Sequence, residues 1–232
     1  MEGELPPETQ LPNEPELAAH LSVSRTTVRS ALAILEQAGF IQRRWGVGTF
    51  IAKDPPTYNN LSLNSGVTQL IRSSGAEPGC VELLLTTRPA SERVSTQLSI
   101  EVGALVLVIE RVRLANEQRA VFTVDFLPMS LFNGLGEDFP LLDIEEYIRT
   151  NQSMYGFLRQ RLSLEIHHGI AWIRPLSAEH YLADKLQIPA GSSVLHIEQV
   201  DFDLNGGPVA LSDEYYVADA FRFYIYRSNQ GA

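Results

Sequence analysis

The sequence predicts an α+β protein of two domains, and three observations lead to that fold class. Residues 14–51 have the pattern of two helices followed by a tight β-hairpin. A segment rich in Pro, Asn and Ser follows, without helical or strand periodicity. The remainder contains long strand-like runs that occur twice, which predicts an antiparallel sheet built from two similar halves. We place the domains at residues 1–53 and 67–232, joined by a linker over 54–66.

The length and charge of the chain limit its function. With 232 residues, 44% of them apolar and 20% charged, it is long enough for one large or two ordinary domains. The net charge of −10 is uneven, because residues 1–53 carry five basic and six acidic side chains and the rest carry thirteen and twenty-two. Within residues 17–53, five basic side chains accompany one acidic side chain. This local positive charge favours a nucleic-acid partner, and an acidic second domain keeps non-specific DNA affinity low.

The compartment follows from cysteine content and hydropathy. Cys80 is the only cysteine, so an intrachain disulfide is excluded, and we interpret it as a small, partly buried apolar residue. No apolar run approaches membrane-spanning length, and the acidic N-terminus is unlike a signal peptide. We therefore expect a cytoplasmic protein without a membrane partner.

The first predicted helix runs from Glu14 to His20. Asn13 precedes it and Glu16 follows three residues later, the capping-box spacing that satisfies two N–H groups of a helix start. After a short turn, Ser24 can cap a second helix, which Gly39 is expected to end. The apolar residues of this second helix recur at helical spacing at Val28, Ala31, Leu32 and Leu35.

The opposite face of the second helix is polar. Its side chains are of the kinds that bond phosphates and base edges, namely Arg25, Thr26, Arg29 and Ser30, with Thr27 on the border. A strand ending in Arg43 and Arg44, a turn over 45–48 and a return strand over 49–51 follow the helix. These strands form a wing, and the whole stretch is suited to hold one helix against double-stranded DNA.

Two motifs carry a family resemblance, SRTTVRSALAILEQAGFI over residues 24–41 and RRWGVGTFI over residues 43–51. They resemble the winged-helix domain of GntR-type transcription regulators. The resemblance implies that the second helix contacts an operator and that the tip of the wing enters the minor groove. The implied DNA-binding residues are Ser24, Arg25, Thr26, Thr27, Arg29, Trp45 and Gly46.

The chain departs from that family at two places. Pro15 stands where the family usually has an arginine, which removes one expected DNA contact. The family also has a helix before this point, whereas residues 1–12 hold three prolines and are not expected to form one. The winged helix is therefore expected to be incomplete at its N-terminus, and an effector-binding protein with a degenerate DNA-binding domain is one alternative.

The second domain contains the internal repeat. After a short helix over 67–74, residues 97–128 overlie residues 185–216 without a gap, and ten of the 32 positions are identical. Each copy has the pattern of a helix end, a Gly-containing turn, a long strand, a hairpin and a second strand. Helices over 145–160 and 178–186 are expected to pack on the resulting sheet.

Four motifs in this domain carry a second resemblance. They are ERVRLANEQ (110–118), AVFTVDFLP (120–128), SMYGFL (153–158) and PAGSSVLHIEQ (189–199). They resemble the UTRA effector-binding domain of the HutC branch of GntR regulators, whose fold is similar to chorismate lyase. This likeness implies a ligand-responsive transcription regulator, most often a repressor.

The two copies differ at one informative place. Arg111 and Arg113 in the first copy correspond to Gln199 and Asp201 in the second. Residues two apart on a strand share a face, so two guanidinium groups point the same way from an otherwise apolar strand. Unpaired cations there would be costly, which favours a small anionic effector. The alternative is neutralisation within the protein by Glu110, Asp125 or Asp213.

The resemblance extends the candidate effector site. It implies that the two arginines hold a phosphate or carboxylate of the effector and that Ser153 and Tyr155 contact it, although a Ser at a helix start is usually a cap. Alternation in the last hairpin places three further polar residues on one face, as a pocket wall. The predicted effector site is Arg111, Arg113, Ser153, Tyr155, Ser212, Glu214 and Tyr216.

Other ligand chemistry is not expected. Ala210 and Val217 stand where sugar-phosphate-responsive relatives have Glu and Arg, which argues against a sugar phosphate. His167 and His168 are expected on opposite faces of a strand, so they could not share a metal, and we expect neither metal nor cofactor.

Two further expectations concern the class of protein and its assembly. The competing class is an enzyme related to chorismate lyase, but no Ser/His/Asp, Cys/His or paired-carboxylate constellation supports it. One winged helix makes few DNA contacts, so we expect a homodimer on a pseudo-palindromic operator.

Overall fold

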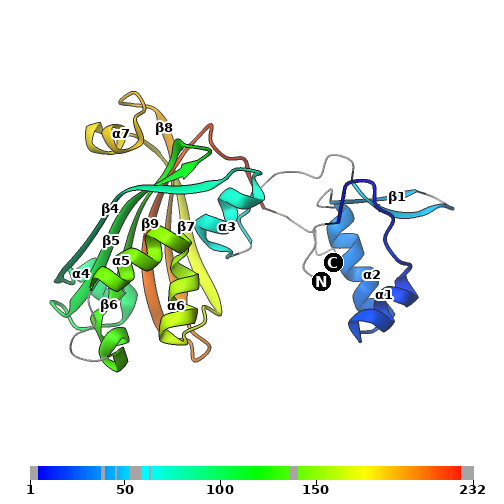
Figure 1. The fold of residues 1–232 in the computed structure, drawn as a ribbon, viewed down its shortest axis with the longest axis horizontal. Coiled ribbons are helices and arrows are strands. Elements are labelled where there is room, and N and C mark those ends of the chain that lie inside the picture. Colours follow the sequence, from blue (N-terminus) through cyan, green and yellow to red (C-terminus); the bar gives the residue numbers. More distant parts are fainter. Residues whose placement is uncertain are drawn as a thin grey trace, which may run out of the picture. The chain divides into compact units, whose positions relative to one another are not determined.

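The computed structural model of the protein describes residues 5–37, 40–44, 46–52, 59–62, 64–135 and 141–225. The chain divides into two compact units, and of the described residues, 5–52 belong to the first and 59–225 to the second (Figure 1). None of the helices in the described ranges is long and apolar enough to cross a membrane.

The first unit contains helices α1 (Glu14–Leu21) and α2 (Arg25–Gln37) and strands β1 (Ile41–Arg44) and β2 (Gly48–Ile51). The predicted capping box is confirmed, because the Asn13 side chain accepts from the Glu16 N–H and the Glu16 carboxylate accepts from the Asn13 N–H, each at 2.9 Å. Helix α1 is one residue longer than predicted. Gly39, the expected end of the second helix, lies outside the described residues.

The segment over residues 5–12 forms no helix, as expected for a proline-rich stretch, and it contains a turn in which Glu8 has φ of +62°. It also pairs with the wing, which the sequence did not indicate. The Glu8 N–H donates to the Ile51 carbonyl at 3.1 Å, and the Leu11 N–H donates to the Thr49 carbonyl at 2.8 Å. The antiparallel pair β1–β2 therefore gains a third extended segment along β2.

The core of the first unit is small. Its buried side chains are Ala18, Val28, Leu32 and Ile41. Of the predicted apolar stripe of α2, Val28 and Leu32 are buried, whereas Ala31 and Leu35 are exposed. Half of that predicted apolar stripe is therefore exposed to solvent in the described part of the chain.

A six-stranded antiparallel sheet, in the order β4-β5-β6-β9-β8-β7, forms the second unit. Its strands are β4 (Pro78–Pro89), β5 (Leu105–Ala115), β6 (Gln118–Pro128), β7 (His168–Ser177), β8 (Ser193–Phe202) and β9 (Pro208–Val217). Two short parallel strands, β3 (Asn59–Asn60) and β10 (Phe223–Tyr224), pair separately. The prediction of an antiparallel sheet is confirmed.

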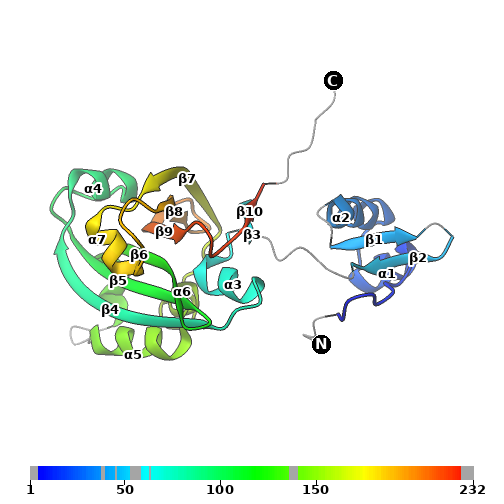
Figure 2. The ribbon, with the colours of Figure 1, turned by 90° about the horizontal axis from the view of Figure 1, so that it is seen from above.

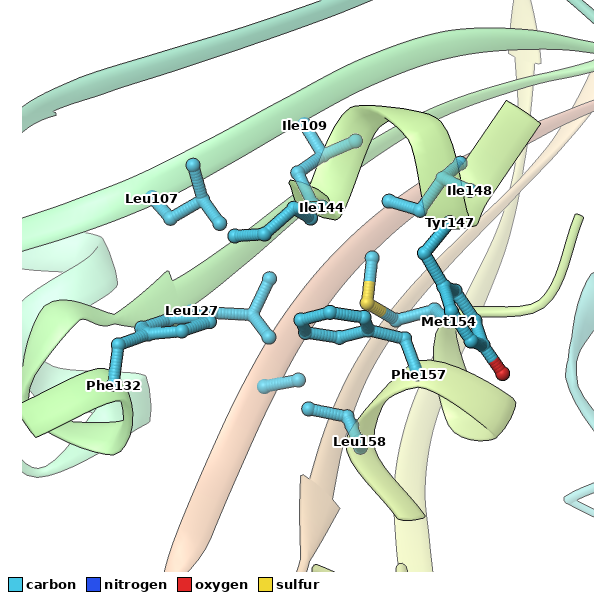
Figure 3. Packing of buried hydrophobic residues seen from close by; sticks show 11 residues of the cluster. Leu107, Ile109, Leu127, Phe132, Ile144, Tyr147, Ile148, Met154, Phe157 and Leu158 are labelled. Carbon is cyan, nitrogen blue, oxygen red and sulfur yellow. The ribbon is translucent and has the colours of Figure 1, made fainter. Parts of the chain in front are cut away.

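Helices cover both faces of the sheet (Figure 2). Helices α4 (Glu92–Leu98) and α7 (His180–Leu186) pack on one face. The other face carries α3 (Gly66–Ser73), α5 (Leu141–Asn151), α6 (Met154–Leu162) and the 3-10 helix η1 (Met129–Leu135). Figure 3 shows how α5 and α6 pack on the sheet. Ile144 and Ile148 of α5 and Phe157 of α6 lie against Leu127 and Ile109 of the sheet.

The prediction of one helix over 145–160 is wrong. The chain breaks into α5 and α6 at Gln152, whose φ of +62° is left-handed, and at Ser153. The Ser153 hydroxyl accepts from the Gly156 N–H at 3.0 Å and caps α6. A local serine cap therefore overrides the continuous helical pattern.

The two halves of the sheet are duplicates, and they share helix positions and backbone angles. Helices α4 and α7 occupy positions that differ by 88 residues, and Gly103 and Gly191, also 88 apart, both have φ of +84°. In β9 the offset between the two copies is 89 residues and not 88. Val106 pairs with Pro128, whereas Val194, its counterpart at an offset of 88, pairs with Val217. The gapless alignment of the repeat is therefore wrong by one residue in β9.

This one-residue change alters which side chains correspond. With an offset of 89 in β9, Asp125 corresponds to Glu214 and Thr123 corresponds to Ser212. A pseudo-two-fold axis relates the two halves of the sheet, and it passes between the paired residues Val124 and Asp213, which correspond to each other. Asp213 lies on the face that carries α4, where it pairs with Arg93, whereas Asp125 lies on the other face, in a pocket lined by α3 and α6.

Candidate functional site

The N-terminus of α2 presents the predicted DNA-contacting side chains. Arg25 and Thr26 are exposed. The Ser24 hydroxyl accepts from the Thr27 N–H at 3.1 Å, and the two side-chain oxygens lie 2.7 Å apart. Ser24 and Thr27 are thus committed to the predicted cap, while Arg25, Thr26 and Arg29 project from the polar face of the helix.

Acidic side chains accompany the arginines of this unit. The Arg29 guanidinium donates to the Glu14 carboxylate at 2.9 Å, and it lowers the pKa of Glu14 through this hydrogen bond. Arg43 lies 3.2 Å from Glu36, and Arg44 lies 3.2 Å from Glu8. These pairs are exposed, so DNA phosphates can compete for the guanidinium groups.

The turn between β1 and β2 places Gly46 at the tip of the wing. Gly46 has φ of +70°, and a Cβ atom built on it would meet no heavy atom within 4 Å. The tip is therefore free to approach another molecule, although any side chain there would be strained. Trp45, the other predicted wing contact, lies outside the described residues.

The second candidate site is a pocket between the sheet and helices α3 and α6. Strands β5, β6, β8 and β9 form its floor, and Gly66, Val67 and Thr68 of α3 cover it. Six of the seven predicted effector residues line this pocket, namely Arg111, Arg113, Ser153, Tyr155, Ser212 and Glu214. The seventh, Tyr216, hydrogen-bonds the Glu214 carboxylate.

The two arginines are buried and differently paired. Arg111 donates to Asp125 at 3.3 Å, so the predicted internal neutralisation holds for one of them. The Arg111 Nη1 atom is buried without a hydrogen-bond partner among the described residues. Arg113 donates to the Thr68 hydroxyl at 2.9 Å and to the Gly79 carbonyl at 3.5 Å, and no carboxylate of the described chain pairs with it.

The electrostatics of the pocket follow from this burial. Burial and the nearby Arg111 lower the pKa of Arg113 to about 9. Burial raises the pKa of Glu214 to about 7 and that of Asp201 to about 6. Near neutral pH, burial therefore destabilises both the charged form of Arg113 and the charged form of Glu214. A ligand anion beside the guanidinium would stabilise the Arg113 cation.

The structure separates the three carboxylates that the sequence offered as internal partners. Asp125 lies in the pocket and pairs with Arg111. Glu110 and Asp213 lie on the other face of the sheet, in a cavity beside α7. Val217, one of the two positions used against a sugar phosphate, packs with α7 on that other face, so only Ala210 bears on the pocket.

Sequence reasoning missed the residues that close the pocket. The Asp201 carboxylate accepts from Asn64 at 2.9 Å and from Gln199 at 2.8 Å, and the Tyr155 hydroxyl lies 2.8 Å from it. Thr68 joins Arg113 to the carbonyl of Gln152, to which its hydroxyl donates at 2.6 Å. Gln199 and Asp201 were visible as the counterparts of the two arginines, whereas Asn64 and Thr68 carry no local sequence signal.

The pocket is small. Its cavity volume is about 30 Å³, which holds about two water molecules. A wider cavity of about 470 Å³ adjoins it and shares Ser65, Thr68, Ser153 and Tyr155 as lining residues. The two cavities therefore meet at the start of α3 and at Tyr155.

The structure places His167 and His168 side by side. The expectation that His167 and His168 point to opposite faces is wrong, because their Nδ1 atoms lie 3.1 Å apart. His167 precedes β7, so strand alternation does not apply to it. Among the described residues, no group of three or more His, Cys, Asp or Glu side chains could hold a metal ion.

Comparisons with known proteins agree with this arrangement. The UTRA domain family matches residues 73–222, and the family of bacterial regulatory proteins named gntR matches residues 1–51. The chain is 28% identical over 210 residues to the HTH-type transcriptional regulator YurK of Bacillus subtilis (strain 168), covering 90% of this chain and 83% of YurK.

Two further comparisons cover nearly the whole chain. The HTH-type transcriptional repressor NagR of the same organism is 28% identical over 224 residues, which are 97% of this chain and 88% of NagR. The crystal structure of the possible transcriptional regulator YydK from Bacillus subtilis subsp. subtilis str. 168 matches in fold with a TM-score of 0.68. It has 23% sequence identity and covers 97% of this chain and 92% of that one.

Proposed function

The chain belongs to the gntR-family transcription regulators that carry a UTRA domain, and from this premise we propose that it is a repressor released from its operator by a small anionic metabolite. As in its family, a DNA-binding unit and a ligand-responsive unit share one chain. We propose that the ligand carries a negative charge, that its binding releases the operator, and that the residues named below bind it.

The observation that carries the proposal is the state of the two buried arginines. Arg113 is 1% exposed and has only neutral acceptors among the described residues, while one N–H group of Arg111 lacks any acceptor. A buried cation without a counter-ion is destabilising, and a phosphate, phosphonate or carboxylate would satisfy both groups. The natural ligand is therefore an anion.

The remaining pocket residues indicate what else this anion carries. Asp125, Asp201 and Glu214 are acceptors or neutral acids beside the arginines, and they can bind hydroxyl or amine hydrogens. Ser153 and Ser212 are committed to the α6 cap and to the Asp125 carboxylate, respectively. We propose a polar metabolite with one anionic group held by Arg111 and Arg113 and with hydrogen-bond donors near Asp201 and Glu214.

Transmission to the DNA-binding unit starts at α3. Asn64 hydrogen-bonds Asp201 and Thr68 hydrogen-bonds Arg113. Asn64 lies within the proposed linker, and Thr68 lies in α3 directly after it. A ligand anion competes with the Thr68 hydroxyl for the Arg113 guanidinium. Ligand binding would therefore loosen α3 and change the constraint on the linker, and the ligand acts only through its difference in affinity between the two arrangements.

On DNA we propose that α2 reads the major groove and that the wing tip at Gly46 enters the minor groove. A homodimer would place two such units on a pseudo-palindromic operator. Light scattering at micromolar concentration tests the assembly, and a monomer would contradict it.

The operator-release experiment tests the function itself. DNA from upstream of the gene is footprinted to locate the operator, and a labelled fragment is bound by the protein in a fluorescence anisotropy assay. Anions that raise the melting temperature are then added. The proposal predicts that at least one of them releases the fragment, and binding that is indifferent to every stabilising anion would overturn it.

A further inference from the structure

A second cavity lies on the other face of the sheet, away from the effector pocket. Its volume is about 440 Å³. Phe122 and Phe126 of β6 and Tyr215 of β9 line it together with Tyr181 of α7. Its charged lining residues are Arg88, Glu110, Glu179 and Asp213. Aromatic rings beside carboxylates suit a cation with an apolar body.

The duplication provides an internal comparison for this cavity. In one half of the sheet, Arg93 of α4 donates to Glu198 at 2.6 Å and to Asp213 at 2.6 Å. Its guanidinium carbon also lies 5.6 Å from the centre of the Phe126 ring. The arginine therefore fills a site made of two carboxylates and an aromatic ring, all within the protein.

The pseudo-two-fold axis carries this site onto the second cavity. The offset of 88 relates Arg93 to Tyr181 and Glu110 to Glu198, and the offset of 89 relates Phe126 to Tyr215. The carboxylate and the aromatic ring are therefore present in both halves, but the arginine is present in only one.

Glu110 consequently lacks the partner that Glu198 has. The hydrogen bond that Glu110 makes within the described chain is with the Tyr181 hydroxyl, at 3.4 Å. Two cations lie nearby. Lys185 is held by Glu82 at 2.9 Å and lies over the rings of Phe122 and Tyr181, and the Arg88 guanidinium lies over the Phe126 ring. The place that a guanidinium occupies in one half is thus open in the other, beside a carboxylate to which no arginine of the described residues hydrogen-bonds.

We propose that this second cavity is a binding site for an organic cation, in which a guanidinium or ammonium group contacts Glu110 and its apolar body lies against Tyr215, Tyr181 and Phe122. The ligand takes the place that the Arg93 side chain fills in the other half. Val124 stands where Asp213 stands in the other half, and Asp213, which also lines this cavity, is paired with Arg93. Glu110 is therefore the carboxylate that we assign to the single positive charge of the ligand. This site is independent of the anion pocket.

Butylguanidinium is a probe with the required chemistry, and butylurea is its neutral counterpart of similar shape. Isothermal titration calorimetry on the full chain should detect butylguanidinium binding at one site and should detect butylurea at least tenfold more weakly. Glu110→Gln should weaken butylguanidinium at least tenfold. Tyr181→Arg should also abolish binding, because the new guanidinium would occupy the site as Arg93 does in the other half.

Two more variants make the test independent of folding defects and of the anion pocket. Arg93→Ala should open the corresponding site at Glu198 and raise the stoichiometry for butylguanidinium from one to two. Asp201→Asn, in the anion pocket, should leave the titration unchanged. Equal binding of butylurea, or unchanged affinity in both Glu110→Gln and Tyr181→Arg, would overturn the proposal.

Discussion

Arg113 donates to the Thr68 hydroxyl at 2.9 Å, and this bond ties the centre of the sheet to the first helix after the proposed linker. The same hydroxyl donates to the Gln152 carbonyl at the break between α5 and α6. One side chain therefore joins three elements around the effector pocket, and a ligand that binds Arg113 must act on this bond.

Replacement of Thr68 by valine should destabilise the protein. Thr68→Val keeps the volume of the side chain but leaves a buried guanidinium N–H and a carbonyl without partners, at a cost of about 1–3 kcal/mol. Urea denaturation measures the loss. The matched control is Thr123→Val, which removes a longer bond of 3.4 Å to Arg111 and should cost less. An equal loss in both variants would show that the Thr68 bond has no special role.

The DNA contact of α2 can be tested at Arg29, whose guanidinium is exposed and paired with Glu14. Arg29→Ala should weaken binding to the operator roughly 5- to 150-fold and relax sequence preference at one position. Glu14→Gln should tighten binding at low salt, because it frees Arg29 and removes a negative charge near the phosphates. Footprint titrations measure both effects. Unchanged operator affinity in Arg29→Ala would remove that residue from the recognition surface.

The stability of the protein should depend on pH through Glu214. Burial raises the pKa of Glu214 to about 7 from 4.5, so the folded state favours the protonated form. The stabilisation by protonated Glu214 is complete below pH 4.5 and is lost as the pH rises through 7. The loss in the free energy of unfolding is on the order of 3 kcal/mol. Glu214→Gln should therefore gain stability relative to the wild type between pH 5 and pH 8.

Denaturation of both proteins at several pH values measures this difference. Asp201→Asn is the matched comparison, because burial raises the pKa of Asp201 to about 6 and its loss of stability should be complete at a lower pH. Parallel stability curves for wild type and Glu214→Gln would contradict the account. Because ionised Glu214 repels an anion at Arg111, affinity for the effector should also fall as the pH rises from 6 to 8.

Local chemistry explains which parts of the fold could be predicted from the sequence. The capping box at Asn13, the wing and the duplicated sheet each depend on residues close in the chain or repeated in it. The break at Gln152 was missed because the helical pattern continues through it and only a cap at Ser153 ends it. The register of β9 was missed because ungapped identities such as Val121 and Val209 favoured the wrong offset.

The candidate site divides in the same way. Strand alternation correctly grouped Arg111 with Arg113 and Ser212 with Glu214, because two-residue periodicity fixes which side chains share a face. Partners contributed by distant segments could not be predicted from one sequence. Thr68 meets Arg113 across 45 residues, and Asn64 meets Asp201 across 137, so only the fold brings them together.

The central claim is that an anion bound at Arg111 and Arg113 releases the operator. The most direct measurement compares wild type and Arg111→Ala, first by thermal shift with phosphorylated sugars, phosphonates and carboxylates, then by operator release with each stabilising anion. Arg111→Lys, which keeps the charge but loses the guanidinium fork, serves as the folding control. Tenfold release requires about 1.4 kcal/mol of coupling, within the usual range for allostery. The account predicts that Arg111→Ala binds the operator nearly as wild type does and no longer responds to the anion. Equal stabilisation and equal release in wild type and Arg111→Ala would contradict it.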